Sequence, residues 1–282
     1  MILIAESGST KTDWVLLKQG KIQKQQQTLG INPFHQDMSS IIDNLRSLEN
    51  AHPIEQIFFY GAGCATQESK QKVKDALLEV FPSASCDIQS DVLAAARSVC
   101  GRENGIACIL GTGSNSCLYN GINITHNVRP LGYILGDEGS GAVLGKRLIA
   151  DLLKGVAPED ITNAFYKKHN MEYAHIINNV YREEAPSRFL AQFTVFLSEN
   201  VEHPYVSSLL QEEFTKFFER NIKQYDNHSR LPIHFIGSIA YYFKNELMKV
   251  AKKLNLLTGK IIKSPLEGLV EYHIAELNLN HE

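Results

Sequence analysis

Short apolar runs separated by polar turns make up much of the first hundred residues. Three of these runs lie within the first 28 residues, and the brief turns between them predict antiparallel strands. Apolar residues then recur at a helical spacing in three longer segments, with strand-like runs between them. Strands are expected over residues 2–5, 13–18, 21–28, 56–60 and 85–89. Helices are expected over residues 38–48, 67–81 and 91–100.

The same order of elements starts again after residue 105. Here a long stretch of helical periodicity, broken near Pro186 and Pro204, separates the first strands from the last ones. Strands are expected over residues 106–110, 116–119, 122–126, 233–236 and 260–262. Helices are expected over residues 141–153, 239–254 and 266–277. This order predicts an α/β protein with two lobes, residues 1–103 and residues 104–282, the second with a helical insertion at about residues 155–228.

Three turns combine glycines with hydroxyl side chains, at residues 7–10, 110–115 and 136–141. The first two directly follow an apolar strand. Glycine lets the backbone come close to a phosphate chain, and free N–H groups and hydroxyls can donate to phosphate oxygens. A single turn of this kind is more often a β-hairpin. Three of them in one chain predict a nucleotide held between two lobes.

Composition and charge narrow the classes of function. With 282 residues, 44% hydrophobic and 21% charged, the chain is typical of a folded protein with room for two domains. A net charge of −3 without a basic block gives no support for nucleic-acid binding. No apolar run approaches a membrane span, and the start of the chain differs from a signal peptide. We therefore expect a cytoplasmic protein that binds neither nucleic acid nor membrane.

The cysteines and histidines show no metal-binding or disulfide pattern. The five cysteines form no C-x-x-C pair, and their odd number argues against a complete disulfide framework. Most are expected to be small buried apolar residues, with Cys64 singled out because it lies in a glycine-containing loop. The ten histidines have no zinc-binding spacing.

Taken together, these segments resemble one superfamily. Duplicated lobes with a glycine turn after the first strand of each look like the sugar kinase, heat-shock ATPase and actin superfamily. Within it, five segments match in order the BadF/BadG/BcrA/BcrD-type ATPases, and among these the N-acetylglucosamine kinases. The segments are residues 8–10, 89–91, 111–115, 132–140 and 235–238. The resemblance implies a two-lobed actin-like (ribonuclease H-like) fold with a nucleotide cleft between the lobes.

The resemblance also implies an ATP-dependent sugar kinase, with phosphorylation of N-acetylglucosamine at its 6-hydroxyl as the expected reaction. Phosphoryl transfer needs a cradle for the phosphates, Mg²⁺, and a base for the attacking hydroxyl. Glu6, where the superfamily more often has aspartate, is expected to hold Mg²⁺ through water, with Asp137 as a second candidate. The expected ATP contacts are Gly8, Ser9, Thr10, Lys11, Gly111, Thr112, Gly113, Ser114, Gly237 and Ser238.

Asp91 is the expected catalytic base. It follows a predicted strand, and either Asp91 or Ser90 stands at the start of an alanine-rich helix. Aspartate is also a favoured N-cap, and the two roles can coexist. A carboxylate at this position could accept the proton of a sugar hydroxyl. The other sugar contacts that the resemblance implies are Asn32, Gly63, Leu131, Gly132 and Asp137. Before Gly132 the chain has Pro130-Leu131 where animal relatives have Gly-Trp, so the identity of the sugar stays open.

Other functions stay open. A BadF-type activating ATPase for a dehydratase or reductase would bind a [4Fe–4S] cluster through cysteine thiolates, and no cysteine is convincingly placed for one. A nucleotide-dependent sensor would bind a sugar without phosphorylating it, which Asp91 argues against. The zinc-bearing repressor/kinase type of glucokinase is disfavoured by the missing cysteine cluster. The oligomeric state stays open too, with a homodimer among the options.

Residues 141–146 resemble a P-loop but depart from its pattern. Only three residues separate the two glycines where a P-loop has four, and Arg147 follows Lys146 where a P-loop has Ser or Thr. We expect this segment to be the first turns of a helix.

Overall fold

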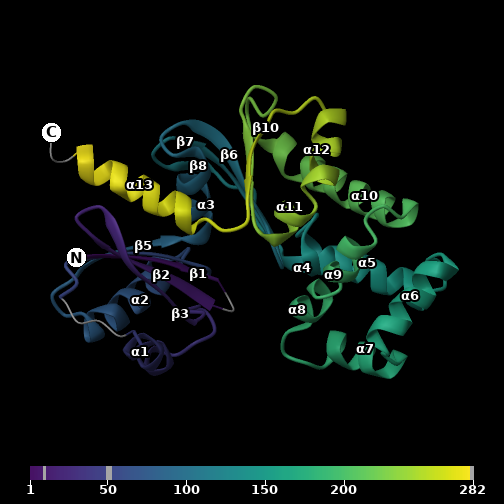
Figure 1. Cartoon of the computed structure of the whole chain (residues 1–282), viewed down its shortest axis with the longest axis horizontal. Coiled ribbons are helices and arrows are strands. Elements are labelled where there is room, and N and C mark those ends of the chain that lie inside the picture. Colours follow the sequence, from purple (N-terminus) through teal and green to yellow (C-terminus); the bar gives the residue numbers. More distant parts are fainter. Residues whose placement is uncertain (9–10, 49–52, 280–282) are drawn as a thin grey trace. The chain divides into compact units, whose positions relative to one another are not determined.

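The computed structural model describes residues 1–8, 11–48 and 53–279. These residues form two compact units (Figure 1). Unit 1 consists of Met1–Arg102, Gly121–Asn123 and Pro265–Glu282, and unit 2 consists of Glu103–Asn120 and Ile124–Ser264. The first break between units thus lies one residue from the division expected from the sequence.

Unit 1 is built on a five-stranded sheet in the order β3-β2-β1-β4-β5. The central strand β1 pairs antiparallel with β2 and parallel with β4, and β5 extends the parallel side. The carboxyl ends of β1, β4 and β5 therefore lie at one edge of the sheet. The strands are β1 (Ile2–Ser7), β2 (Lys11–Lys18), β3 (Lys21–Leu29), β4 (Gln56–Gly61) and β5 (Ser85–Ser90).

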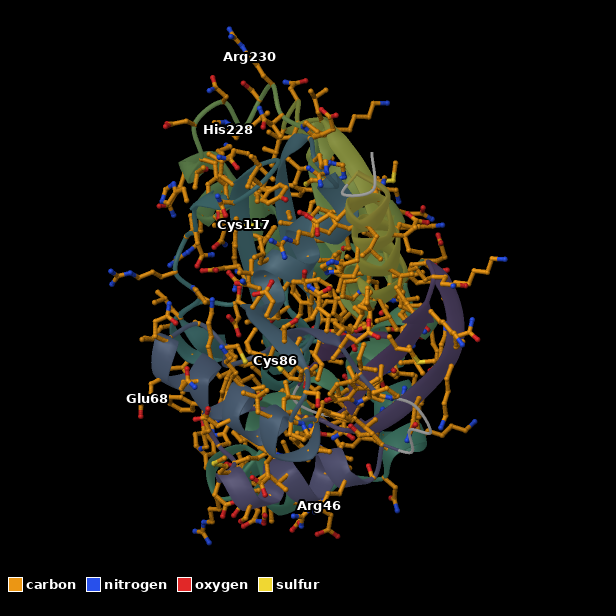
Figure 2. All side chains as sticks on the ribbon, turned by 90° about the vertical axis from the view of Figure 1, so that its left-hand side faces the viewer. Arg46, Glu68, Cys86, Cys117, His228 and Arg230 are labelled. Carbon is orange, nitrogen blue, oxygen red and sulfur yellow. The ribbon has the colours of Figure 1, made fainter. Side chains whose placement is uncertain are left out.

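Helices cover both faces of this sheet (Figure 1). Side chains alternate along β1, so that Leu3 and Ala5 enter one apolar core and Ile4 enters another. The core with Leu3 and Ala5 contains side chains of α1 and α2, and the core with Ile4 contains side chains of α3 and α13. These helices are α1 (Met38–Arg46), α2 (Gln67–Val80), α3 (Asp91–Cys100) and α13 (Leu266–Leu279). Charged side chains such as Arg46 and Glu68 extend from α1 and α2 into solvent (Figure 2).

Unit 2 repeats the topology of unit 1. Its strand order is β8-β7-β6-β9-β10, and its central strand β6 pairs antiparallel with β7 and parallel with β9. The duplicated order of strands that the sequence predicts is therefore confirmed. The strands are β6 (Asn104–Leu110), β7 (Ser114–Asn120), β8 (Ile124–His126), β9 (Ile233–Ile236) and β10 (Thr258–Ile262).

The helices of unit 2 include the long insertion between β8 and β9. Aromatic residues on these helices, among them Phe165, Phe196 and Phe214, join Phe235 of β9 in one apolar core. The helices are α4 (Gly132–Leu135), α5 (Gly141–Leu153), α6 (Glu159–His169), α7 (Tyr173–Tyr181), α8 (Pro186–Ala191), α9 (Thr194–Glu199), α10 (Pro204–Arg220), the 3-10 turn η1 (Ile222–Gln224), α11 (Ser238–Tyr242) and α12 (Lys244–Lys253).

The segment that resembles a P-loop is helical, as expected. It forms the start of α5, with Ser140 as the N-cap residue. A Cβ built on Gly145 would lie 1.9 Å from the carbonyl oxygen of Leu190, so this glycine lets α8 pack closely against α5. Lys146 donates to the carbonyl oxygen of Tyr133 at 2.6 Å. Gly145 therefore packs α5 against α8, and Lys146 joins α5 to α4.

Helix α13 returns to unit 1, although the sequence order places it beside the last strand of unit 2. It contacts α3 and β1, and Leu269 and Val270 are buried in the same core as Ile4. A Cβ built on Gly268 would lie 2.4 Å from the carbonyl oxygen of Ser98, so the two helices approach closely at this glycine. Residues 265–282, which the expected division counts with the second lobe, thus belong to the first compact unit.

Candidate active site

The expected site residues of unit 1 gather where the parallel strands of the sheet end. Glu6 lies near the end of β1, opposite Asp13 of β2. Asp91 follows β5 directly and is the first residue of α3. Because parallel strands end at a common edge, these three acids from distant parts of the sequence share one region.

The turn after β1 is fixed to the segment that follows β3. The hydroxyl oxygens of Ser7 and Thr12 lie 2.7 Å apart, and both residues are fully buried. Ser7 also donates to the carbonyl oxygen of Ile31 at 3.0 Å and accepts from its N–H at 2.8 Å. The N–H of Gly8 donates to the carbonyl oxygen of Lys11 at 3.0 Å, which closes the turn. The expected ATP contacts Ser9 and Thr10 lie outside the described residues.

Two of the expected sugar contacts, Asn32 and Gly63, lie side by side. Gly63 has a φ of 80°, and a Cβ there would lie 2.3 Å from Oδ1 of Asn32, so only glycine fits. The same Oδ1 accepts from the N–H of Phe34 at 3.0 Å. The loop is held further by Lys72, which donates to the carbonyl oxygen of Pro33 at 3.1 Å. The structure therefore brings together two loops that are 31 positions apart in the sequence.

The acids of unit 1 are poorly compensated by positive charge. Burial, followed by the charges of Asp13 and Asp91, raises the pKa of Glu6 to about 7, while Lys11 opposes this rise. Burial also raises the pKa of Asp91. The ammonium group of Lys11 lies 2.8 Å from Oδ2 of Asp13. A cation placed among these carboxylates would relieve their mutual repulsion.

Ser90, and not Asp91, is the N-cap of α3. The Ser90 hydroxyl accepts from the N–H of Leu93 at 3.3 Å. Asp91 stands one position further on, and its Oδ1 accepts from the N–H of Val92 at 2.9 Å. Because the serine provides the cap, the Asp91 carboxylate is available for other chemistry.

Cys64 is buried beside these acids. Burial, followed by the charge of Asp91, raises the pKa of its thiol to about 12. The thiol therefore stays protonated at neutral pH, and a protonated thiol is a poor nucleophile and a poor metal ligand.

In unit 2 the turn between β6 and β7 contacts Asp137. The N–H of Gly111 donates to the carbonyl oxygen of Gly113 at 3.0 Å, and the N–H of Gly141 donates to the carbonyl oxygen of Gly111 at 2.8 Å. A Cβ on Gly113 would lie 2.9 Å from Oδ2 of Asp137. Burial raises the pKa of Asp137. The backbone N–H of Ser114 donates to its carboxylate and opposes this rise, but burial has the larger effect.

Gly237 joins the same region from the end of β9. Its φ is 115°, and a Cβ there would lie 2.3 Å from the carbonyl oxygen of Leu110, directly before the Gly111 turn. Ser238, the first residue of α11, is exposed beside it. The two expected ATP-binding segments of unit 2, which follow β6 and β9, and the loop before α5 that carries Asp137 are therefore neighbours in the fold.

The glycines of these turns differ in what surrounds them. Among the described residues, a Cβ on Gly111 would have no atom within 4 Å, and one on Gly8 would meet the carbonyl oxygen of Lys11 at 3.9 Å. Internal contacts therefore do not require glycine at these two positions. Open space over a backbone turn is what the close approach of a phosphate group needs.

A polar pocket of about 300 Å³ in unit 2 adjoins Asp137. Of the expected sugar contacts, Leu131 and Asp137 line it, and Gly132 lies next to Leu131 with a φ of 73°. Nε of Arg220 lies 2.5 Å from Oε1 of Glu138. The pocket also contains polar residues that were not expected in the site, which are Asn115, Arg129, Glu138, Arg220, Asn221 and Gln224.

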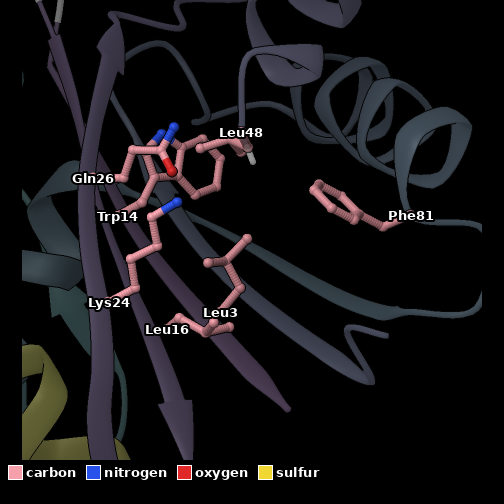
Figure 3. Close-up of a pocket in the computed structure, with 7 residues that line it drawn as sticks. All are labelled: Leu3, Trp14, Leu16, Lys24, Gln26, Leu48 and Phe81. Atoms are coloured by element: carbon pink, nitrogen blue, oxygen red, sulfur yellow. The ribbon is translucent and has the colours of Figure 1, made fainter. Parts of the chain in front are cut away.

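Other hollows contain none of the expected site residues. A pocket of about 20 Å³, the space of a water molecule or two, lies over β1, β2 and β3 (Figure 3). Trp14, Leu48 and Phe81 are among the side chains that line it. A larger pocket of about 770 Å³ lies along α12 in unit 2. Among the described helices, none is long and apolar enough to cross a membrane.

The chain is similar to several solved structures. No protein-family model matches the chain, and no curated protein does. A solved structure from Porphyromonas gingivalis, provisionally named an N-acetylglucosamine kinase, is 48% identical, with a TM-score of 0.93, and the match covers 98% of this chain and 99% of that chain. A structure with the same provisional name from Chromobacterium violaceum is 16% identical, with a TM-score of 0.77, covering 96% of this chain and 98% of that one.

A third similar structure is a ROK-family glucokinase from Streptomyces griseus, solved with glucose and AMPPNP. It is 12% identical with a TM-score of 0.60, and the match covers 98% of both chains. At this identity the likeness concerns the fold alone. The duplicated units and these matches define the two-lobed actin-like ATPase fold of sugar kinases. At 48% identity over nearly the full length of the Porphyromonas gingivalis protein, the chain belongs to the actin-like sugar kinases.

Proposed function

We propose that the protein transfers the γ-phosphoryl group of ATP to an amino sugar, N-acetylglucosamine, at its 6-hydroxyl. The observation that carries this proposal is the 48% identity, over nearly the whole chain, to a protein provisionally named an N-acetylglucosamine kinase. The buried acids of unit 1 and the open glycine turns supply the groups that such a reaction needs.

Asp91 is the base in the proposed reaction. Its carboxylate accepts the proton of the sugar hydroxyl while the hydroxyl oxygen attacks the γ-phosphorus. The bond from the γ-phosphorus to the bridging oxygen breaks, and ADP leaves with that electron pair. Burial raises the pKa of Asp91, which strengthens it as a base and brings its pKa closer to neutral pH, where general bases are most efficient. Asn32 and Gly63, which lie together, are proposed to contact the sugar.

The phosphates of ATP are proposed to bind at the backbone turns of Gly8 and Gly111. Among the described residues, no atom would lie within 4 Å of a Cβ on Gly111 and none closer than 3.9 Å to one on Gly8, which supports close approach of a phosphate group. The exposed hydroxyl of Thr112 can donate to a phosphate oxygen. The other proposed ATP contacts are Ser9, Thr10, Lys11, Gly113, Ser114, Gly237 and Ser238.

The acids also fit a role in holding Mg²⁺. The pKa of Glu6, raised to about 7 by burial and by two neighbouring carboxylates, marks an excess of negative charge that a cation would balance. No group of three or more His, Cys, Asp and Glu side chains in the described residues forms a ready-made metal site. Mg²⁺ usually takes one or two carboxylates, several waters and substrate phosphates. We propose that Glu6, and Asp137 as a second candidate, hold Mg²⁺, which would neutralise charge on the transferred phosphoryl group.

The proposal is tested by coupled ADP release with Mg-ATP and four sugars: N-acetylglucosamine, glucosamine, N-acetylmannosamine and glucose. We expect N-acetylglucosamine to give the highest kcat/KM. Asp91→Asn keeps the size of the side chain but removes the base, and turnover should fall about 100-fold or more. The matched control is Asp75→Asn, an exposed acid on α2, which should retain full turnover. ADP release that is independent of sugar, or an active Asp91→Asn variant, would contradict the assignment.

The state of the cysteines favours this proposal over a BadF-type activating ATPase. Four of the five are buried, and only Cys86 is partly exposed (Cys86 and Cys117 are labelled in Figure 2). A [4Fe–4S] cluster shared between two copies would need accessible thiolates, and the Cys64 thiol has a pKa of about 12. An absorbance spectrum of protein purified without oxygen should therefore lack iron–sulfur bands.

A further inference from the structure

The loop that carries Leu131 has no regular secondary structure of its own. It runs from Asn127, after β8, to Leu131, before α4. Residues 128–131 form one wall of the polar pocket, while Ser114 and Asn115 of β7 line it from another side. Unless other groups fix this loop, the shape of the pocket would vary. Contacts from a distant part of the chain provide that support.

Tyr225 joins the loop to β7. It lies directly after η1, at the end of the helical insertion, and only 1% of its surface is exposed. Its hydroxyl oxygen accepts from the N–H of Val128 at 3.1 Å and lies 2.7 Å from Oγ of Ser116. Since the tyrosine oxygen accepts from the backbone, its own proton is free to be donated to the serine. The edge of its ring also contacts His126, with ring centroids 5.3 Å apart.

Asn127 makes a second connection between the same two segments. Its Nδ2 donates to Oδ1 of Asn115 at 2.9 Å and to the carbonyl oxygen of Ser116. Asn115 Oδ1 in turn accepts from the N–H of Ser116 at 2.8 Å. The loop and the strand are therefore linked by two neighbouring sets of hydrogen bonds.

We propose that Tyr225 is a positioning residue for the sugar, because its hydroxyl holds the loop of residues 127–131 against β7 and so sets the width of the polar pocket. This inference rests on the proposed kinase function. The two partners of the hydroxyl differ in how firmly they are held. Ser116 lies within the β6–β7 ladder, opposite Cys108, whereas Val128 lies in the irregular loop. Loss of the hydroxyl should therefore let the loop shift at Val128, while Asn127, its first residue, is still joined to β7 and β7 stays in place.

The expected signature is a change in sugar binding without a change in ATP binding. The proposed phosphate contacts Gly111 and Gly113 lie in the turn before β7, whereas the Tyr225 hydroxyl contacts Ser116 within β7 and Val128 in the loop. In Tyr225→Phe, the KM for N-acetylglucosamine should rise about five-fold, the factor that loss of one ordinary hydrogen bond gives. The KM for ATP should stay within about two-fold of the KM that the unaltered protein has for ATP.

Two further variants separate positioning from general loss of stability. Tyr205→Phe removes the hydroxyl of a partly buried tyrosine on α10, which donates to Oδ2 of Asp151 at 2.9 Å and not to the loop. It should leave both KM values unchanged while the melting temperature falls by a similar amount. Ser116→Ala removes only the partner on β7, so that Tyr225 still accepts from Val128, and its effect on the sugar KM should be smaller than that of Tyr225→Phe.

The outcomes distinguish the positioning role from the proposed function itself. If the unaltered protein releases ADP with N-acetylglucosamine, and Tyr225→Phe has an unchanged sugar KM, then the positioning role is wrong and the kinase function stands. If Tyr205→Phe raises the sugar KM as much as Tyr225→Phe does, the effect is one of stability and the positioning role is again wrong. If the unaltered protein phosphorylates none of the sugars, the proposed function itself fails.

Discussion

At the scale of single residues, Glu6 makes stability depend on pH. Its pKa in the folded protein is raised to about 7, from 4.5 for the ordinary side chain. Between these values the folded protein keeps a proton that the unfolded chain has released. The free energy of unfolding therefore decreases as the pH rises from about 4.5 to about 7, and the stabilisation is complete only below the lower value.

Glu6→Gln should remove this part of the pH dependence, because the amide does not ionise. We expect the melting temperature of the metal-free protein to fall less between about pH 5 and about pH 8 in the variant than in the unaltered protein. Asp91 and Asp137, whose pKa values burial also raises, should leave some dependence in both. Parallel curves for the two proteins would show that Glu6 titrates near its ordinary value.

The glycines at the proposed ATP site should respond differently to alanine. Gly111 has open space where a Cβ would stand, so Gly111→Ala should leave the melting temperature nearly unchanged and raise the KM for ATP. Gly237→Ala forces a positive φ on alanine and places its Cβ 2.3 Å from a carbonyl oxygen, which should cost about 1–3 kcal/mol of stability. Thermal unfolding and ATP kinetics check both. Equal loss of stability in the two variants would refute the contrast.

The sequence marks candidate acids and glycines for the proposed site, but it does not show which residues surround them. The motif around Asp91 marked the acid, but only the structure shows that Ser90 caps the helix in its place. The contact of Gly63 with Asn32 depends on how two loops fold toward each other, and neither segment contains a sign of the other. The sequence does not predict Arg129 and Arg220 as pocket residues for the same reason, since only the fold brings both to the wall of one pocket.

At the scale of elements, periodicity predicted strands and long helices because the faces they bury repeat regularly. It did not predict α4, which has four residues and is too short to show a period. It also merged α11 and α12 into one helix. Phe243, which separates them, is 2% exposed and continues the apolar pattern, while its φ of −105° and ψ of 24° depart from the helix. A buried residue at a helix break therefore looks like a helical residue in the sequence.

Helix α13 should depend on close contact with α3. In Gly268→Ala the new methyl group would lie 2.4 Å from the carbonyl oxygen of Ser98, so the helices must separate or shift. We expect a loss of about 1–3 kcal/mol in the free energy of unfolding, measured by denaturant titration. Glu271→Ala, an exposed position on the same helix, should change it by less than about 0.5 kcal/mol. A Gly268→Ala variant as stable as this control would contradict the close contact.

At the scale of the whole molecule, the duplicated topology could be predicted because each half repeats the same order of strands and helices. The return of α13 to unit 1 could not, since its apolar residues only require some apolar surface to cover. Sequence order favours the neighbouring strand β10, whereas α13 buries Leu269 and Val270 beside Ile4 of β1. Which surface a terminal helix covers is decided by shape, here by the close approach at Gly268.

Ligand binding should stabilise the whole protein in proportion to its affinity, because a ligand that binds only the folded state shifts the unfolding equilibrium by mass action. At 100 times its dissociation constant a sugar adds about 2.7 kcal/mol, which corresponds to a rise of about 5 °C in melting temperature. N-acetylglucosamine should produce such a rise, and glucose, which lacks the acetamido group, a smaller one at the same concentration. Sorbitol at equal concentration controls for general solvent effects. Equal stabilisation by the two sugars would mean that the acetamido group is not recognised, and the proposed substrate would have to be widened to hexoses in general.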